Sequence, residues 1–216
     1  MSIQNVYDQG LLSRLAVISR NVQRRVGDVL LDRISGIDTS DDVWHEQLQF
    51  SPDRGTEYTP TSWLALLRLK AILEDMDISE KDTFIDFGSG KGRVLFLAAH
   101  YAFRMVIGVD LSRALNQIAR RNIDRNLNRL VCKNIQLITS DAEHFEIPDT
   151  TTVAYFYNPF LGQVFTKTVD GIRSSLERNS REFRLIYAYP VMHDYVVQSR
   201  FRLVRKEGYT HLYTSQ

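Results

Sequence analysis

The spacing of apolar and polar positions predicts helices in the first third of the chain. Apolar side chains recur every three to five positions over residues 11–35, which predicts an amphipathic helix. Residues 36–57 are rich in turn formers and predict a loop with a short helix. Thr59 then suits the N-cap, and Pro60 the first position, of a second helix that continues to about Leu73.

From about residue 82 onward, strand-like runs alternate with helix-like runs. This alternation predicts an α/β fold with a doubly wound, Rossmann-like and mostly parallel sheet. The apolar character of the strands fits a sheet with both faces covered by helices. The strand-like runs are TFIDF, MVIGVD, NIQLITSD, TVAYFYNPF and FRLIYAYP. The helix-like runs begin at Arg93, at Ser112 and near Leu161.

The C-terminal residues 201–216 differ from this pattern. Two β-rich runs flank a Lys-Glu-Gly turn, which predicts an antiparallel hairpin. Together with the five preceding runs, the hairpin completes a seven-stranded sheet. We therefore expect residues 81–216 to form the ligand-binding domain and residues 1–80 to form an N-terminal helical cap, or lid, integrated with it.

Composition and charge narrow the classes of protein. The hydrophobic content of 44% is enough to build a core, and a net charge of +1 gives no overall field that would recruit a polyanion. The single cysteine, Cys132, excludes an internal disulfide framework. The N-terminus lacks the pattern of a secretory signal, and no apolar run approaches the roughly 20 residues of a membrane helix. We expect a cytoplasmic protein with no membrane partner.

A glycine-rich loop carries the main chemical signal. Residues 86–93 read DFGSGKGR, directly after a strand and opening a helix. Glycines there let the backbone turn sharply and let a ligand approach the main chain. Asp110 ends the next strand, where an acid in a doubly wound sheet can accept bonds from ribose hydroxyls. The two features predict a nucleoside-binding crevice at the carboxyl ends of the strands.

The loop does not fit the two commonest nucleotide motifs. The dinucleotide fingerprint G-x-G-x-x-G requires a glycine where this chain has Arg93, which argues against an NAD-dependent oxidoreductase. A P-loop requires serine or threonine after its Gly-Lys pair, and here Gly92 follows Lys91.

The loop and the second strand end resemble the first two motifs of class I, seven-β-strand methyltransferases that use S-adenosylmethionine. Ser140-Asp141-Ala142 resembles the segment whose acid reads the adenine amine, and Asn158-Pro159-Phe160 resembles the fourth motif, which faces the methyl group. The terminal hairpin resembles the antiparallel seventh strand of the family. The resemblance covers roughly residues 80–216.

This resemblance implies S-adenosyl-L-methionine as methyl donor and a set of cofactor contacts. Asp86 would orient the methionine amino group, Asp110 would hold the ribose hydroxyls, and Asp141 would accept from the adenine amine. The remaining contacts would come from the loop and from residues beside these acids, namely Gly88, Ser89, Gly90, Leu111 and Ala142.

The fourth motif would supply the catalytic residues Asn158, Pro159 and Phe160. Asn158 would also lie beside the sulfonium methyl of the cofactor. The run Tyr155 to Tyr157 can supply aromatic walls that stabilise positive charge. Because side chains in a strand alternate between faces, only some of these rings can reach the crevice.

A narrower likeness bears on the acceptor. Tyr58-Thr59-Pro60-Thr61, together with YNPF, is similar to bacterial relatives of the histone-lysine methyltransferases that lack a SET domain. It implies methylation of a protein amine of the lysine type, with Tyr58 over the cofactor. A small-molecule or RNA acceptor, and a module that binds S-adenosylmethionine without turnover, remain alternatives.

Two further features leave alternatives open. The five histidines show no metal-ligand spacing, so we expect no catalytic metal. His193 is a candidate base near the substrate entrance. The predicted helix 112–129 is basic, which fits a solvated face or a surface that contacts RNA. Its arginines are Arg113, Arg120, Arg121, Arg125 and Arg129.

Overall fold

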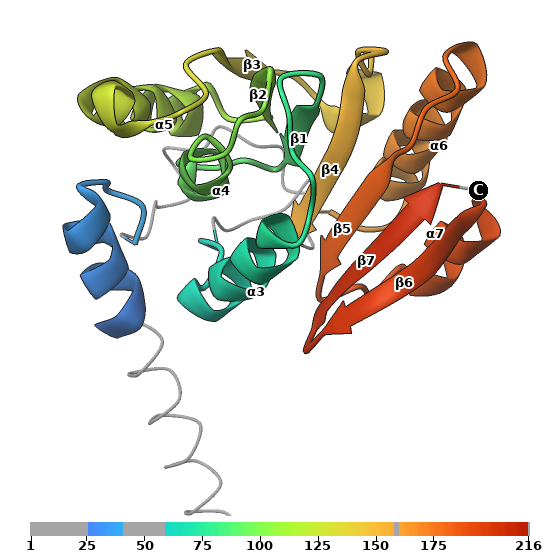
Figure 1. Ribbon diagram of the computed structural model, residues 1–216, viewed down its shortest axis with the longest axis horizontal. Helices are drawn as coiled ribbons and strands as arrows, with labels where there is room; N and C mark the ends of the chain where they lie inside the picture. Colours follow the sequence, from blue (N-terminus) through green and yellow to red (C-terminus); the bar gives the residue numbers. More distant parts are fainter. Residues whose placement is uncertain (1–25, 41–58, 158–159, 216) are drawn as a thin grey trace, which may run out of the picture.

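A seven-stranded sheet runs through the centre of the molecule in a computed structural model that describes residues 26–40, 59–157 and 160–215 (Figure 1). The strand order is β3-β2-β1-β4-β5-β7-β6, and β7 alone in this sheet runs opposite to the other six strands. The predicted mostly parallel sheet with an antiparallel C-terminal hairpin is therefore confirmed. Its strands are β1 (Thr83–Phe87), β2 (Met105–Asp110), β3 (Ile135–Thr139), β4 (Thr151–Tyr157), β5 (Arg184–Ala188), β6 (Phe201–Glu207) and β7 (Thr210–Ser215).

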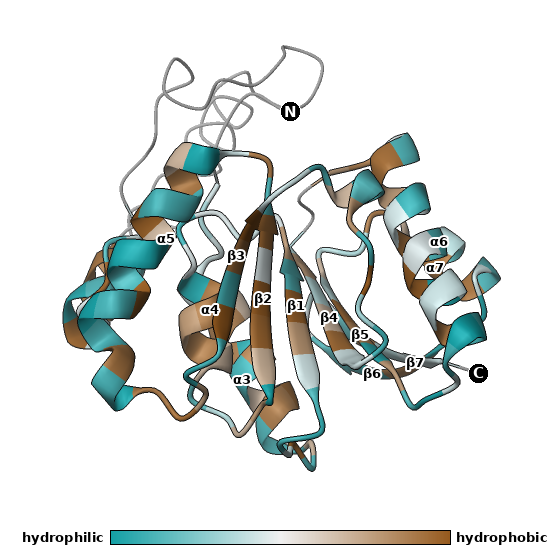
Figure 2. Cartoon of the chain, turned by 90° about the horizontal axis from the view of Figure 1, so that it is seen from above, coloured by the Kyte–Doolittle hydropathy of each residue, from teal (hydrophilic) through white to brown (hydrophobic). Residues whose placement is uncertain are grey.

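Helices cover both faces of the sheet, as the apolar strands require (Figure 2). One face, here the α4 face, packs against α3 (Trp63–Glu74), α4 (Arg93–Ala98) and α5 (Arg113–Asn126). The opposite α6 face packs against α6 (Gly162–Arg178) and α7 (His193–Gln198). Short 3-10 helices follow α5 and β3, namely η1 (Leu127–Arg129) and η2 (Ala142–His144).

Alternate residues of each strand enter the two cores. In β1, Phe84 packs in the core of the α4 face, whereas Ile85 and Phe87 pack in the core of the α6 face. Asp86 therefore shares the α4 face with Phe84. All five β1 residues are buried, which explains why this strand reads as a continuous apolar run interrupted by one acid.

The sheet brings four strand ends together at one edge. The strands β2, β1, β4 and β5 are parallel neighbours, so their carboxyl ends share what we call the carboxyl edge. Between β1 and β4 the order of the chain reverses, which makes this the topological switch point. Ligands of doubly wound sheets bind outside the carboxyl ends at such a point.

A buried ion cluster ties the N-terminal region to α4. A helix at residues 26–35 places Asp28 and Asp32 beside Arg93, whose guanidinium lies 2.7 Å and 3.1 Å from their carboxylates. Arg93 also donates to the Thr39 hydroxyl at 2.5 Å and to the Thr61 carbonyl at 2.6 Å. Since all three charged side chains are buried, they form a strongly coupled unit.

Helix α5 holds the segment after this N-terminal helix by two buried amides. Asn122 donates to the carbonyls of Asp38 and Lys91 at 2.9 Å and 3.0 Å, and its own oxygen accepts from the Asp38 amide. Asn126 donates to the Gly36 carbonyl at 3.0 Å. The N-terminal segment therefore contacts both the glycine loop and α5.

Several predicted boundaries differ from the structure. Thr59 is not the N-cap of α3; Ser62 is, because its hydroxyl accepts from the Ala65 amide. The helix-like run RVLFLAAHYA, residues 93–102, forms a helix only over α4, which ends at Ala98; the Ala99 carbonyl then accepts two amides from residues 131–132.

Two further points concern helices. The prediction of a helix over 11–35 is tested only at 26–35, since residues 1–25 lie outside the described part. The short helix α7 was not predicted. In the parts of the chain that the structure describes, no helix has the length and apolarity to cross a membrane.

Replacing Arg93 with methionine should lower the free energy of unfolding by about 3–5 kcal/mol, because Asp28 and Asp32 would remain buried without their cation. Urea denaturation followed by circular dichroism measures this change. The control Lys70→Ala removes an exposed pair with Glu74 and should leave stability nearly unchanged. Equal effects of the two substitutions would contradict a structural role for the cluster.

Candidate cofactor and acceptor site

The glycine loop after β1 turns through backbone conformations that suit glycine. Gly88 and Gly90 have φ values of 77° and 52°, in the left-handed region. The amides of Gly88 and Ser89 both donate to the carbonyl of Val109, at 2.8 Å and 3.2 Å. The loop therefore folds back from β1 onto the end of β2.

The carboxylate of Asp110 fixes this loop at the carboxyl edge. One oxygen accepts from the Gly90 amide and the other from the Ser112 amide, each at 2.8 Å. The side chain is only 8% exposed. A carboxylate has about four acceptor positions, so two remain after these bonds. The geometry leaves Asp110 able to accept from a vicinal diol.

Asp86 is a second buried acid close to Asp110. Burial raises the pKa of Asp86 well above its ordinary value, and the negative charge of Asp110 raises it further. Burial also raises the pKa of Asp110, although the amides of Ser112 and Gly90 oppose that shift. The charges of Asp86 and Asp110 interact, so this pair of buried acids favours a ligand that brings a positive charge.

A glycine that the sequence did not single out lets the loop approach β2. A Cβ on Gly108 would lie 2.5 Å from a Leu95 methyl and 2.7 Å from the Ser89 hydroxyl. The Ser89 hydroxyl is itself buried, and it has no hydrogen-bond partner among the described residues. The strand sequence MVIGVD held the signal, since glycine within a strand often marks a close approach of another backbone.

The segment after β3 lies beside Asp110. The Ser140 amide donates to the Asp110 carbonyl at 3.1 Å, which places Asp141 and Ala142 next to the end of β2. The Asp141 carboxylate caps η2 by accepting from the Glu143 amide, and Ala142 is buried. Leu111, after Asp110, is 39% exposed. Leu111, Ser140, Asp141 and Ala142 therefore gather beside Asp110, along one side of the edge.

Asp141 also belongs to a cluster of acidic and imidazole groups with Glu143 and His144. Their ligand atoms lie within 4.8 Å of one another. The Lys167 ammonium lies 3.1 Å from Glu143, so a protein cation already balances this carboxylate.

The aromatic run of β4 divides between the two faces. Tyr155 and Tyr157 lie on the α4 face with Asp86, and Asp86 is paired directly with Tyr155 across the strands. Phe156 points to the α6 face and stacks on Phe87 at a centroid distance of 5.0 Å. Of these aromatic side chains, only the two tyrosines therefore lie on the same side of the sheet as Asp86.

The residues of the fourth motif are described only in part. Phe160 packs edge-on against Phe156 at 6.2 Å, on the α6 face. Asn158 and Pro159 lie outside the described residues, and so does Tyr58.

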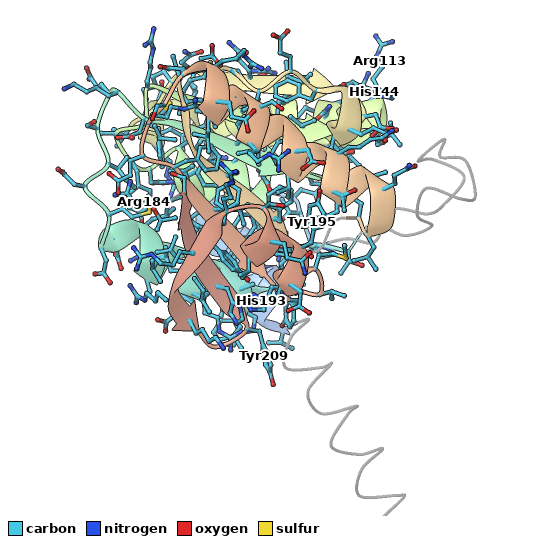
Figure 3. The ribbon with its side chains drawn as sticks, turned by 90° about the vertical axis from the view of Figure 1, so that its right-hand side faces the viewer. Arg113, His144, Arg184, His193, Tyr195 and Tyr209 are labelled. Carbon is cyan, nitrogen blue, oxygen red and sulfur yellow. The ribbon has the colours of Figure 1, made fainter. Side chains whose placement is uncertain are left out.

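His193 does not lie with the two acids. His193 is labelled in Figure 3. Its Nδ1 is 2.7 Å from the hydroxyl of Tyr213, which packs in the core of the α6 face. Arg93 likewise points away from the loop, into the ion cluster with Asp28 and Asp32. The third position of the dinucleotide fingerprint thus serves the N-terminal region and does not meet a ligand.

The two acids favour a nucleoside that carries positive charge over one that carries a diphosphate. In their ionised form, Asp86 and Asp110 would disfavour a diphosphate placed beside them. A ligand with a ribose diol, an ammonium group and a sulfonium suits them, since its positive charges stabilise the ionised acids.

Comparison with known proteins agrees with this geometry. Residues 84–179, from β1 through α6, match the model of a family described as a methyltransferase domain. The chain carries a methyltransferase domain. Its methyl donor is S-adenosylmethionine. No curated protein matches the sequence.

Two solved methyltransferases share the fold with a TM-score of at least 0.50. A SAM dependent methyltransferase from Aquifex aeolicus is 14% identical, with a TM-score of 0.53 over 69% of this chain and 93% of that chain. A candidate S-adenosyl-L-methionine-dependent methyltransferase from Methanococcus maripaludis is 16% identical, with a TM-score of 0.50 over 70% and 83%. An RNA methyltransferase from Salinibacter ruber, in complex with S-adenosyl-L-homocysteine, is 23% identical, with a TM-score of 0.49 over 73% and 92%.

Asp86→Asn should stabilise the ligand-free methyltransferase at alkaline pH. A carboxyl whose folded pKa is raised binds its proton more tightly when folded, so the wild type loses stability as pH rises from about 4 through that raised pKa. The asparagine variant lacks this loss and should gain about 1.4 kcal/mol for each pH unit between the two pKa values. Urea unfolding from pH 5 to 9 measures it, with the exposed Glu80→Gln as control. If the free energy of unfolding changed with pH in the same way in the variant and the wild type, burial would not disfavour the charge of Asp86.

Proposed function

We propose that this methyltransferase transfers a methyl group to an amine nitrogen of a protein, of the lysine type, in the cytoplasm. The observation that carries the proposal is the position of Tyr155 and Tyr157. They lie at the carboxyl edge, on the same face as Asp86, at the strand that precedes the fourth motif. The single cysteine suits a reducing compartment.

In this proposal the acids hold the cofactor at the edge. Asp110 accepts from the ribose hydroxyls with its remaining lone pairs, and Asp86 accepts from the methionine amino group. The other contacts come from residues of the loop and of the segments after β2 and β3, with Tyr58 above: Gly88, Ser89, Gly90, Leu111, Asp141 and Ala142. S-adenosylmethionine supplies a methyl carbon already activated by the sulfonium, so the protein's main task is to align the nucleophile.

An amine must lose its proton before it can attack. A wall of aromatic rings removes water around the amine and so lowers its pKa. The Tyr155 ring is fully buried, and burial, followed by the charge of Asp86, raises the pKa of its hydroxyl well above the ordinary value. The hydroxyl thus stays neutral, and ring faces favour the positive charge of the sulfonium. Asn158 would accept from the amine, with Pro159 and Phe160 shaping the turn.

An amine acceptor fits the site better than a hydroxyl acceptor. A hydroxyl needs a base to remove its proton during attack, whereas an amine of lowered pKa is already neutral. The histidine expected near this region, His193, is bonded to Tyr213 on the opposite face. The choice of a protein acceptor rests on the likeness of residues 58–61 and YNPF to relatives of non-SET lysine methyltransferases.

One observation favours RNA as a second candidate acceptor. Arg113, Arg120, Arg121 and Arg125 are exposed along α5, and no ion pair involving them is found among the described residues. A helix with this charge can contact phosphates. The test below separates the two acceptors.

Incubation of the enzyme with methyl-labelled S-adenosylmethionine and a cell lysate should place label in protein. The label should survive nuclease, be released by protease, and appear as methyl-lysine after acid hydrolysis. Label that nuclease releases would show an RNA acceptor, and label only in small molecules would exclude both macromolecules. Tight cofactor binding without any labelled product would indicate a module that does not turn over.

Asp110→Ala should weaken the binding of S-adenosylmethionine by roughly 10–100-fold, since hydrogen bonds to a charged group contribute about 1.5–3 kcal/mol. Titration calorimetry measures the Kd, and a thermal melt confirms that the variant is folded. Asp124→Ala removes an exposed acid of α5 and is the matched control. An unchanged Kd in the folded Asp110 variant would contradict the proposed ribose contact.

A further inference from the structure

Three tyrosines form a continuous row at the carboxyl edge, starting at the last residue of β4. The rings of Tyr157 and Tyr189 meet edge to face, with centroids 5.6 Å apart and planes at 85°. The rings of Tyr189 and Tyr209 stack, at 5.6 Å and 15°. We call these residues the tyrosine row.

The backbone of Tyr189 is strained. Its φ of 53° lies in the left-handed region, where only one other non-glycine residue of the described chain, Arg200, is found. A residue before proline is also biased toward extended conformations, and Pro190 follows Tyr189. Left-handed backbone costs about 1–2 kcal/mol for such a residue. Strain of this kind persists where the surroundings enforce it, often at functional sites.

The hairpin holds Tyr189 in this conformation. The Tyr189 amide donates to the Tyr209 carbonyl at 2.7 Å, in the turn between β6 and β7. The Arg68 guanidinium of α3 lies 5.4 Å from the centre of the Tyr209 ring. Arg68 also packs so closely on Gly208 that a Cβ there would lie 2.6 Å from its Cζ. Helix α3, the turn and the end of β5 thus form one support for the Tyr189 ring.

The row lies on the side of the edge away from the ribose acid. Tyr157 is paired with Ala188, so Tyr189 follows at the end of β5, two strands from Asp86. Two strand spacings amount to roughly 10 Å. Asp110 lies on the other side of β1, at the end of β2. The row therefore borders the region next to the fourth motif, where an acceptor would approach.

Packing alone does not account for the row. Tyr189 is 38% exposed and Tyr209 is 64% exposed (Figure 3 shows Tyr209 at the end of the hairpin). A ring that served only the core would be buried, as Tyr187 and Tyr213 are. A strained backbone that keeps a half-exposed ring at the carboxyl edge instead suits contact with another molecule.

We propose that the tyrosine row is the acceptor-binding wall of this methyltransferase and that Tyr189 determines its specificity. Its ring offers a flat apolar surface to the methylene chain of an alkyl amine, and its negative face attracts the ammonium before the proton is lost. This inference rests on the proposed function, since it takes its acceptor chemistry from the protein amine.

The test uses substitutions that separate the ring from the backbone. Asparagine tolerates left-handed φ, so Tyr189→Asn removes the ring while keeping the turn. Tyr189→Phe keeps the ring and is the matched control. Initial rates of label transfer from S-adenosylmethionine are measured against the concentration of the lysate fraction that accepts label, and calorimetry gives the cofactor Kd. A thermal melt confirms that each variant is folded.

Tyr189→Asn should raise the apparent KM for the protein acceptor by about tenfold or more, with the cofactor Kd unchanged and with Tyr189→Phe close to wild type. Protein labelling with an unchanged acceptor KM would overturn the wall and leave the proposed function intact. If the label appears in RNA and its rate of transfer falls in Tyr189→Asn, the acceptor is not a protein amine. The tyrosine row would still be the acceptor-binding wall. A loss of cofactor affinity in Tyr189→Asn as large as the change in acceptor KM would overturn the inference. So would the absence of labelled product in every fraction.

Discussion

The carboxylate of Asp110 is the constraint on which the site depends. By accepting from the amides of Gly90 and Ser112, it joins the glycine loop, the end of β2 and the start of α5 at one point. Both bonds are made by backbone groups, so the carboxylate fixes main-chain positions and not merely a side chain. The close approach of Ser89 to Gly108 keeps the loop against the same strand. Contacts within the protein thereby fix the backbone of the glycine loop at the switch point.

The acids of the site are costly in the ligand-free protein, and the rest of the fold compensates. Burial disfavours the charge of Asp86, and Asp110 adds repulsion. The surrounding sheet tolerates this because two apolar cores close over its faces and because the Arg93 cluster anchors the N-terminal helix on α4. Local strain and buried charge at a site, offset by regular packing elsewhere, are expected where function and stability compete.

Sequence reasoning recovers the features that depend on local pattern. The apolar runs predict the first and last residues of β1 and β2 correctly, and the turn residues predict the hairpin. The start of α5 at its cap, Ser112, is also predicted. Features that depend on distant contacts are not recoverable. Arg93 reads as an obstacle to a dinucleotide until its partners Asp28 and Asp32, far away in the chain, are in place. Strand alternation likewise shows that the aromatic residues of β4 divide between faces, but only the packed sheet assigns Tyr155 to the side of Asp86.

The tyrosine row was missed because its members come from three separate segments, and only the antiparallel β7 brings Tyr209 to Tyr189. The central claim concerns Asp110, and a crystal structure of the protein with S-adenosylhomocysteine tests it most directly. The account predicts both ribose hydroxyls within hydrogen-bond distance of the Asp110 carboxylate and the amino group of the ligand facing Asp86. A ligand bound elsewhere, or a ribose that makes no contact with Asp110, would contradict it.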